Sequence, residues 1–188
     1  MRKSAALVLW LALWAVLPLQ AQAGNVIQQL DTSHSKMHFE LSGSILQLSG
    51  KFNRFNGSIS LAGPTLTPEK VIIKIDVSDV NVAPVENLPY IAPETIFRAI
   101  PNPVVTFTST SITETSKNNF KIDGLTRRGE KEWKTSFQAV RRKASGTESE
   151  YLLNMRGPIS SFVSELPLAL QGMQQEGVLE CTLNFRKS

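Results

Sequence analysis

Apolar and polar residues alternate along most of the chain, and this period of two constrains the fold more than any other feature. In residues 177–186, Leu179, Leu183 and Phe185 share one phase with other apolar residues, and polar residues occupy the opposite phase. Such alternation is typical of antiparallel strands with one face buried and one in solvent. The same pattern recurs in residues 36–43, 69–80, 104–113 and 132–142. The sequence therefore predicts an all-β protein.

Turn signals divide the chain into eight or nine strands. Asn56-Gly57, Asp123-Gly124 and Ser145-Gly146 are typical turn dipeptides, and Asn118-Asn119 is typical of a hairpin tip. The predicted strands are 26–30, 36–47, 52–62, 69–80, 104–114, 119–126, 132–143, 150–156 and 177–186. Short helical turns are expected at 94–99 and 164–170. So many amphipathic strands can form a two-sheet sandwich or a closed barrel, and periodicity alone does not choose between them.

The stretch 82–103 does not follow this pattern. It holds five of the ten prolines, a density that a central strand does not tolerate. It also carries large apolar residues, including Leu88, Ile96 and Phe97, which must pack on something. Two interpretations remain open: a lid over an open barrel end, or a crossover that covers a sheet edge.

The N-terminus reads as a secretory signal peptide over residues 1–23. Arg2 and Lys3 precede a short apolar run, and Ala21-Gln22-Ala23 matches the small-x-small cleavage pattern. We expect a mature domain of residues 24–188. Cleavage would remove two of the 20 basic residues, leaving 18 against 16 acidic ones and a net charge of +2. That small charge gives no compositional support for nucleic-acid binding.

Few residues could carry catalytic or metal chemistry. Cys181 is the single cysteine, so the chain has no internal disulfide and no cysteine-rich metal or redox motif. Its phase predicts a buried thiol. His34 and His38 lack a clear third ligand, so we expect no metal site. The sequence has no Gly-x-Ser-x-Gly motif, and we expect no enzyme activity.

Two basic clusters, Arg127-Arg128 and Arg141-Arg142-Lys143, leave two alternatives open. They are solvated strand ends, or they contact lipid phosphates or an anionic membrane surface.

Five short motifs follow one another in a fixed order along residues 27–186. They are Asp31-Thr32-Ser33-His34-Ser35 with Phe39; Gly50-Lys51-Phe52-Asn53-Arg54-Phe55-Asn56-Gly57; Phe97 with Pro103 and Val105-Thr106-Phe107-Thr108-Ser109; Gly124-Leu125-Thr126 with Gly129; and a closing strand at 178–185. Together they resemble the YceI-like, polyisoprenoid-binding family of secreted bacterial proteins.

The resemblance implies an antiparallel, lipocalin-like β-barrel of about eight strands, with residues 82–103 as a proline-rich crossover. It also implies a periplasmic carrier that holds a polyprenyl chain or an isoprenoid quinone in an apolar cavity, with no other cofactor. Membrane partners and a transient contact with the membrane surface would be part of that role. The candidate cavity-lining residues are Phe39, Phe52, Phe55, Ile73, Ile75, Phe97, Phe107, Leu125 and Phe137.

An alternative hypothesis remains open. In it, the barrel is filled by its own side chains, holds no lipid and docks a protein partner through residues 82–103.

Overall fold

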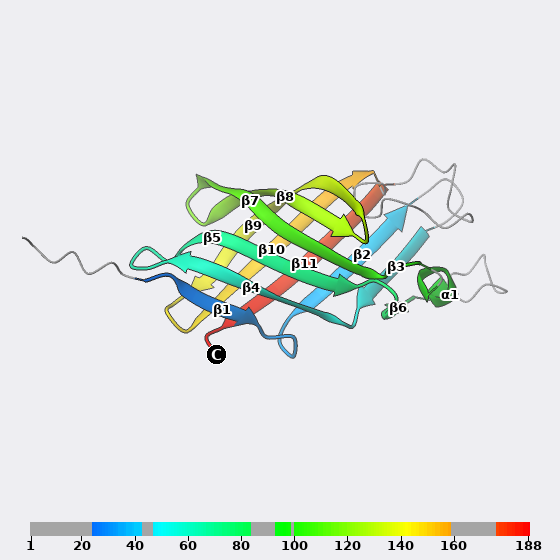
Figure 1. Ribbon diagram of the computed structural model, residues 1–188, viewed down its shortest axis with the longest axis horizontal. Helices are drawn as coiled ribbons and strands as arrows, with labels where there is room; N and C mark the ends of the chain where they lie inside the picture. Colours follow the sequence, from blue (N-terminus) through cyan, green and yellow to red (C-terminus); the bar gives the residue numbers. More distant parts are fainter. Residues whose placement is uncertain (1–23, 43–46, 84–92, 99, 159–175) are drawn as a thin grey trace, which may run out of the picture.

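The protein is an antiparallel β-barrel, and its described residues include one short helix (Figure 1). The computed structural model describes residues 24–42, 47–83, 93–98, 100–158 and 176–188. The elements are β1 (Val26–Leu30), β2 (Lys36–Ser42), β3 (Gln47–Phe52), β4 (Phe55–Ala62), β5 (Thr67–Asp76), β6 (Val80–Val82), α1 (Pro93–Arg98), β7 (Val104–Ser116), β8 (Asn119–Arg128), β9 (Lys131–Ala144), β10 (Glu148–Pro158) and β11 (Glu176–Arg186).

Eight of these strands form a closed ring, in the order β1, β4, β5, β7, β8, β9, β10, β11. The ring closes where β11 pairs with β1, at Gln29 opposite Arg186 and Leu30 opposite Phe185. Closure removes the free edges that an open sheet exposes. The structure therefore confirms the predicted barrel, and the sandwich alternative is wrong.

Three long stretches of the barrel wall are each interrupted in the middle. These stretches are β1–β2, β3–β4 and β5–β6. β1 and β2 both pair with β11, on either side of a turn at residues 31–35. β3 continues into β4 through Asn53 and Arg54, and β5 continues into β6 through residues 77–79. The two breaks are joined by backbone hydrogen bonds from Asn53 N to Asp79 O and from Asp76 N to Arg54 O, both 2.9 Å. Thus β2, β3 and β6 extend the barrel wall at one end.

These breaks account for most differences between predicted and observed strands. The prediction of one strand over 69–80 missed the break after Asp76. The predicted strands 36–47 and 52–62 left out most of β3. Leu48 and Phe52 flank Gly50 in this strand, so the alternation of apolar and polar residues is weak there. The predicted helical turn at 94–99 is confirmed as α1. Residues 1–23, most of 82–93 and the predicted turn at 164–170 lie outside the described residues. Within the described residues, no helix is long and apolar enough to cross a membrane.

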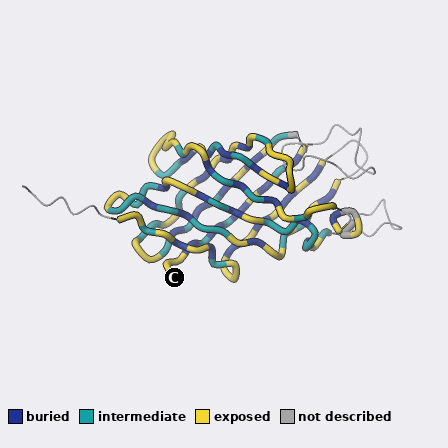
Figure 2. Tube along the Cα trace, viewed as in Figure 1, coloured by how far each residue is buried: buried dark blue, intermediate teal, exposed yellow. Residues whose placement is uncertain are grey.

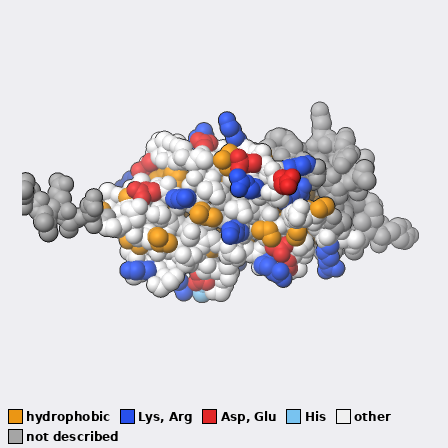
Figure 3. Space-filling model, viewed as in Figure 1, with side chains coloured by type: hydrophobic (Ala, Val, Ile, Leu, Met, Phe, Trp, Pro, Cys, Tyr) orange, Lys and Arg blue, Asp and Glu red, His pale blue; other side chains and the backbone are white. Residues whose placement is uncertain are grey.

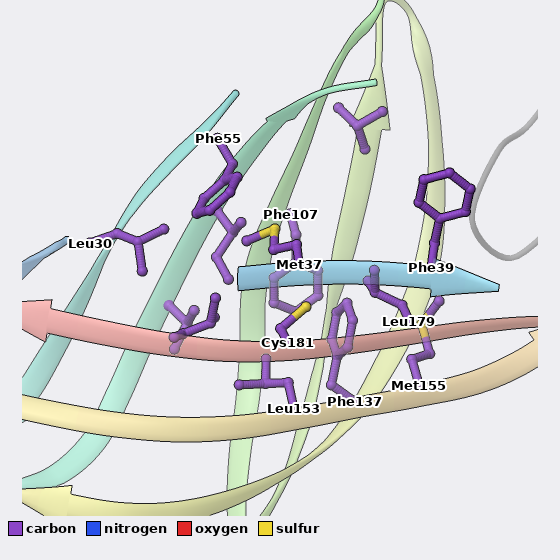
Figure 4. Packing of buried hydrophobic residues seen from close by; sticks show 14 of the residues in the cluster. Leu30, Met37, Phe39, Phe55, Phe107, Phe137, Leu153, Met155, Leu179 and Cys181 are labelled. Carbon is purple, nitrogen blue, oxygen red and sulfur yellow. The ribbon is translucent and has the colours of Figure 1, made fainter. Parts of the chain in front are cut away.

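Buried and exposed residues alternate along the strands, as Figure 2 shows. The inward-facing side chains form one continuous core, part of which appears in Figure 4. At the end near the β7–β8 hairpin tip this core is tightly filled. Its fully buried members include Leu61, Phe120, Leu183 and Phe185.

Two polar side chains at this filled end, Gln28 and Ser149, are hydrogen-bonded to each other. The Gln28 side chain is fully buried; it donates to Ser145 O at 2.9 Å and accepts from Ser149 Oγ at 2.6 Å. Burial raises the pKa of Tyr151 to about 12, so its phenol stays neutral. The filled end is therefore the floor of the barrel.

Candidate ligand-binding site

The opposite end of the barrel contains an apolar cavity of about 90 Å³. The cavity lies between the first residues of β7, β9 and β11 and the last residues of β2, β3, β5, β8 and β10. The helix α1 also contributes to its lining. Of the fifteen described residues that line the cavity, thirteen are apolar. They are Phe39, Leu41, Phe52, Ile73, Ile75, Val77, Phe97, Ile100, Val105, Phe107, Phe137, Met155 and Leu179.

Seven of the nine predicted lining residues lie around this cavity. They are Phe39, Phe52, Ile73, Ile75, Phe97, Phe107 and Phe137. Because they come from six different elements, barrel closure is what brings them together.

Two of the nine predicted residues do not line the cavity. Phe55 is buried in the core, but its pocket is a separate one that includes Thr32 and Asn53. Leu125 faces outward and is half-buried, paired with Thr108 on β7 and Lys134 on β9.

The residues that the prediction missed share the inward phase of their strands. Val105 and Leu179 stand in the same phase as predicted core residues, so the alternation could have found them. Thr126 and Thr135 also face inward. The alternation identifies inward positions by their apolar residues, so it could not indicate that these two threonines line the cavity. Ile100 follows α1, outside any strand pattern.

α1 supplies the aromatic cover of the cavity. The Phe97 ring is buried and its centroid lies 5.3 Å from that of Phe39. Phe39 also contacts Phe52, with centroids 4.9 Å apart. In the described part of residues 82–103, α1 thus covers the cavity, as the lid interpretation predicts, and it also contacts β6, the last strand in the sheet order, as the crossover interpretation predicts.

Deeper in the cavity, Phe107 and Phe137 pack edge to face with centroids 4.8 Å apart. The Phe107 ring packs against Gly124, where an added Cβ would lie within 2.5 Å of both Thr108 O and the ring. Gly50 has the same relation to Phe39, at 2.7 Å. The two motif glycines therefore leave room for the two phenylalanine rings that shape the cavity.

The basic clusters do not behave as free cationic patches. Arg127 is exposed and pairs with Glu132 at 2.6 Å, and Lys143 pairs with Glu148. Arg128 faces inward and is buried, and burial lowers the pKa of its guanidinium. Arg141 is half-buried and bonded within the barrel. The expectation that both clusters are wholly solvated strand ends is therefore wrong for Arg128 and Arg141.

Charges of both signs are interspersed on the described part of the face in Figure 3. On that face, the exposed charges do not form a patch of one sign.

The histidines lie outside the cavity. His38 is exposed on β2, as its phase predicted. His34 Nδ1 lies 2.9 Å from both Asp31 Oδ2 and Ser33 Oγ, so the two partners meet the same ring nitrogen. Because a proton relay needs its partners on opposite ring nitrogens, this cluster is a turn and not a catalytic triad. No three metal-ligating side chains converge among the residues that the structure describes.

Cys181 lies in the core, as predicted. Burial raises the pKa of its thiol to about 12, which makes the thiol unreactive.

A family model described as the YceI-like domain matches residues 28–164. The chain belongs to the YceI-like family. The match covers every strand from β2 to β10, and therefore most of the cavity wall. Among curated protein sequences, none matches this chain.

Solved structures share the fold of this family member. BcnA from Burkholderia cenocepacia is 16% identical with a TM-score of 0.64, and the alignment covers 82% of this chain and 98% of BcnA. A polyisoprenoid-binding domain from Saccharophagus degradans is 14% identical with a TM-score of 0.57, covering 88% and 100%. A YCEI protein from Campylobacter jejuni is 17% identical with a TM-score of 0.54, covering 74% and 84%. At these levels of sequence identity, the likeness to the three structures shows the lipocalin-like barrel fold alone.

Proposed function

We propose that the protein is a non-enzymatic carrier that holds an isoprenoid lipid, a polyprenyl chain or an isoprenoid quinone, inside the barrel. The observation that carries this proposal is the apolar cavity, closed by a filled floor at one end and covered by α1 at the other. Family membership adds support, as does the similar domain from S. degradans that is described as polyisoprenoid-binding.

Binding a prenyl chain in an apolar cavity requires no specific arrangement of polar side chains. Removing apolar surface from water contributes about 25 cal/mol per Å², whatever the direction of approach. A prenyl chain offers mainly such surface. This explains how a carrier could function with a cavity in which thirteen of fifteen lining residues are apolar.

The cavity volume sets a condition on the proposal. A cavity of about 150 Å³ accommodates one benzene molecule, whereas the volume here is about 90 Å³. A chain of more than a few carbon atoms therefore requires lining side chains to turn aside. Phe52 and Phe97 are the natural candidates, because both stand at the covered end and Phe52 is only half-buried.

The proposal includes a periplasmic location. In it, residues 1–23 are removed on export and the mature chain begins at Gly24. The mass of the intact protein from a periplasmic extract tests this directly. A mass that includes residues 1–23 would contradict it.

Two neighbouring valines give a matched test of lipid binding. Val105 lines the cavity and is buried, whereas Val104 is 50% exposed on the outer face of β7. In V105F the added ring occupies the cavity; in V104F it lies in solvent. Proteins purified without detergent would be examined by native mass spectrometry and then by solvent extraction.

We expect a discrete prenyl-lipid mass on the wild type and on V104F, and its loss from V105F. Circular dichroism and thermal unfolding check that V105F folds, since overpacking costs about 1–3 kcal/mol. A wild type that carries no lipid and takes up none on incubation would overturn the proposal. That result would favour the filled barrel that docks a partner through residues 82–103.

A further inference from the structure

The apolar cavity has one polar spot. Among the described residues, Thr126 on β8 and Thr135 on β9 are the two polar ones that line it. Both face inward and are buried, with 5% and 7% of their surface exposed. Their hydroxyl oxygens lie 2.6 Å apart, close enough for a strong hydrogen bond.

Counting protons shows that this pair retains a donor. Each hydroxyl carries one O–H and two acceptor lone pairs. The mutual bond uses the proton of one threonine and leaves the other O–H unused, since no further bond joins either hydroxyl to the part of the chain that the structure describes. A hydroxyl that already accepts a hydrogen bond is a stronger donor. The pair therefore offers one O–H to a molecule in the cavity.

The surroundings favour a neutral acceptor over an anion. Among the described residues, no ionisable side chain lines the cavity. Arg128, the next inward-facing residue of β8, lies outside that lining and has interactions of its own. Bringing a phosphate into such a site would strip its water without a paired charge, at a cost of several kcal/mol.

Next to the threonines, Phe107 and Phe137 present ring surface suited to a flat apolar group. Gly124, directly opposite Thr135 in the β8–β9 register, has no side chain and so leaves room for the Phe107 ring beside the threonines.

We propose that Thr126 and Thr135 form a hydrogen-bond anchor for a neutral carbonyl oxygen, so that the barrel selects a quinone-headed prenyl compound and binds it carbonyl-first. This inference rests on the proposed function and specifies its ligand. The prenyl chain would then lead from the threonines towards the covered end, past Phe39 and Phe52.

The test uses three probes with the same geranyl chain: geranyl-1,4-benzoquinone, geranylbenzene and geranyl monophosphate. Isothermal titration without detergent gives the affinity of each for the wild type and for the double variant T126V/T135V. Valine keeps the shape of threonine and removes both hydroxyls. The control is T106V/T108V, which changes two threonines that point to the outer face of the neighbouring strand.

We expect the affinity for the quinone to fall about three- to tenfold in T126V/T135V, the range of one net hydrogen bond. The affinity for geranylbenzene should stay the same or rise. The phosphate should bind more weakly than the quinone to every variant. In the infrared spectrum, one carbonyl band of the bound quinone should be shifted to lower frequency by the wild type and the control, and not by T126V/T135V.

The possible failures separate the two proposals. If no probe binds the wild type, the carrier function itself fails. If the quinone and geranylbenzene both bind and neither responds to T126V/T135V, the barrel binds lipid but the anchor is wrong. Tight binding of the phosphate would overturn the preference for a neutral head group.

Discussion

At the scale of single residues, the shape of the cavity depends on glycines, which have no side chain, as well as on large aromatic residues. The rings of Phe39 and Phe107 pack against the backbone of the two motif glycines, Gly50 and Gly124. This gives a physical reason for glycine at these positions, since any side chain would occupy the place of a ring that lines the cavity.

We predict that G124A destabilises the protein by about 1–3 kcal/mol, because the added methyl group would lie within 2.5 Å of both Thr108 O and the Phe107 ring, so that both must shift. G146A is the matched control, as an added Cβ there meets no atom within 4 Å. Its effect should stay within about 0.5 kcal/mol. Urea unfolding followed by circular dichroism measures both. Equal midpoints for the two variants would show that the ring has room to move.

At the scale of elements, Arg141 ties three segments together at the floor of the barrel. Its guanidinium donates to Asn118 Oδ1 in the β7–β8 hairpin tip at 3.0 and 3.2 Å, and to Leu66 O beside β5 at 3.0 Å. It also stacks over the Phe120 ring at 5.3 Å from the centroid. One side chain of β9 therefore fixes two turns that are distant in sequence.

We predict that R141M costs about 1.5–3 kcal/mol, the range for hydrogen bonds from a charged donor, because methionine keeps the packing on Phe120 but cannot donate. R142M, at the exposed neighbouring position, should have little effect. The free energy of unfolding measures the cost. Hydrogen exchange at residues 117–119 should accelerate in R141M alone; unchanged exchange there would contradict the role of Arg141 as a tie.

At the scale of the whole molecule, ring closure depends on a short seam. Only two residue pairs join β1 to β11 in the described chain. Asp31 reinforces this seam from the adjoining turn, through an ion pair of 3.1 Å with Arg186 on β11. The Ser33 hydrogen bond, together with the bond to His34 and the charges of His34 and Arg186, lowers the pKa of Asp31 to about 2.

We predict an acid-sensitive contribution of Asp31 to the stability of the closed barrel. Its pKa is lowered from 3.8 on folding, so the contribution is complete above about pH 4 and disappears as the pH falls through about 2. D31N should therefore lower the urea midpoint at pH 6, and the difference from the wild type should shrink as the pH falls from 4 towards 2. A difference that is constant over this range would contradict the ionic origin.

The alternation by itself determined the strand content, the inward phase of most strands and the inward position of cavity residues such as Phe39, Phe107 and Phe137. Period-two burial is a local property of the chain, so a single sequence can display it. The closed ring with a lipocalin-like order came from the family resemblance, because periodicity fits a sandwich equally well.

The tertiary structure decided what no local pattern contains. The phase of β8 is set by its neighbours β7 and β9, which turned Leu125 outward and Thr126 inward. The pairing of Thr126 with Thr135 depends on the register between two strands, and the cavity volume depends on five phenylalanine rings from five elements meeting in space. Register, ring closure and packing are long-range properties, and they leave the threonine pair as the polar feature of an otherwise apolar cavity.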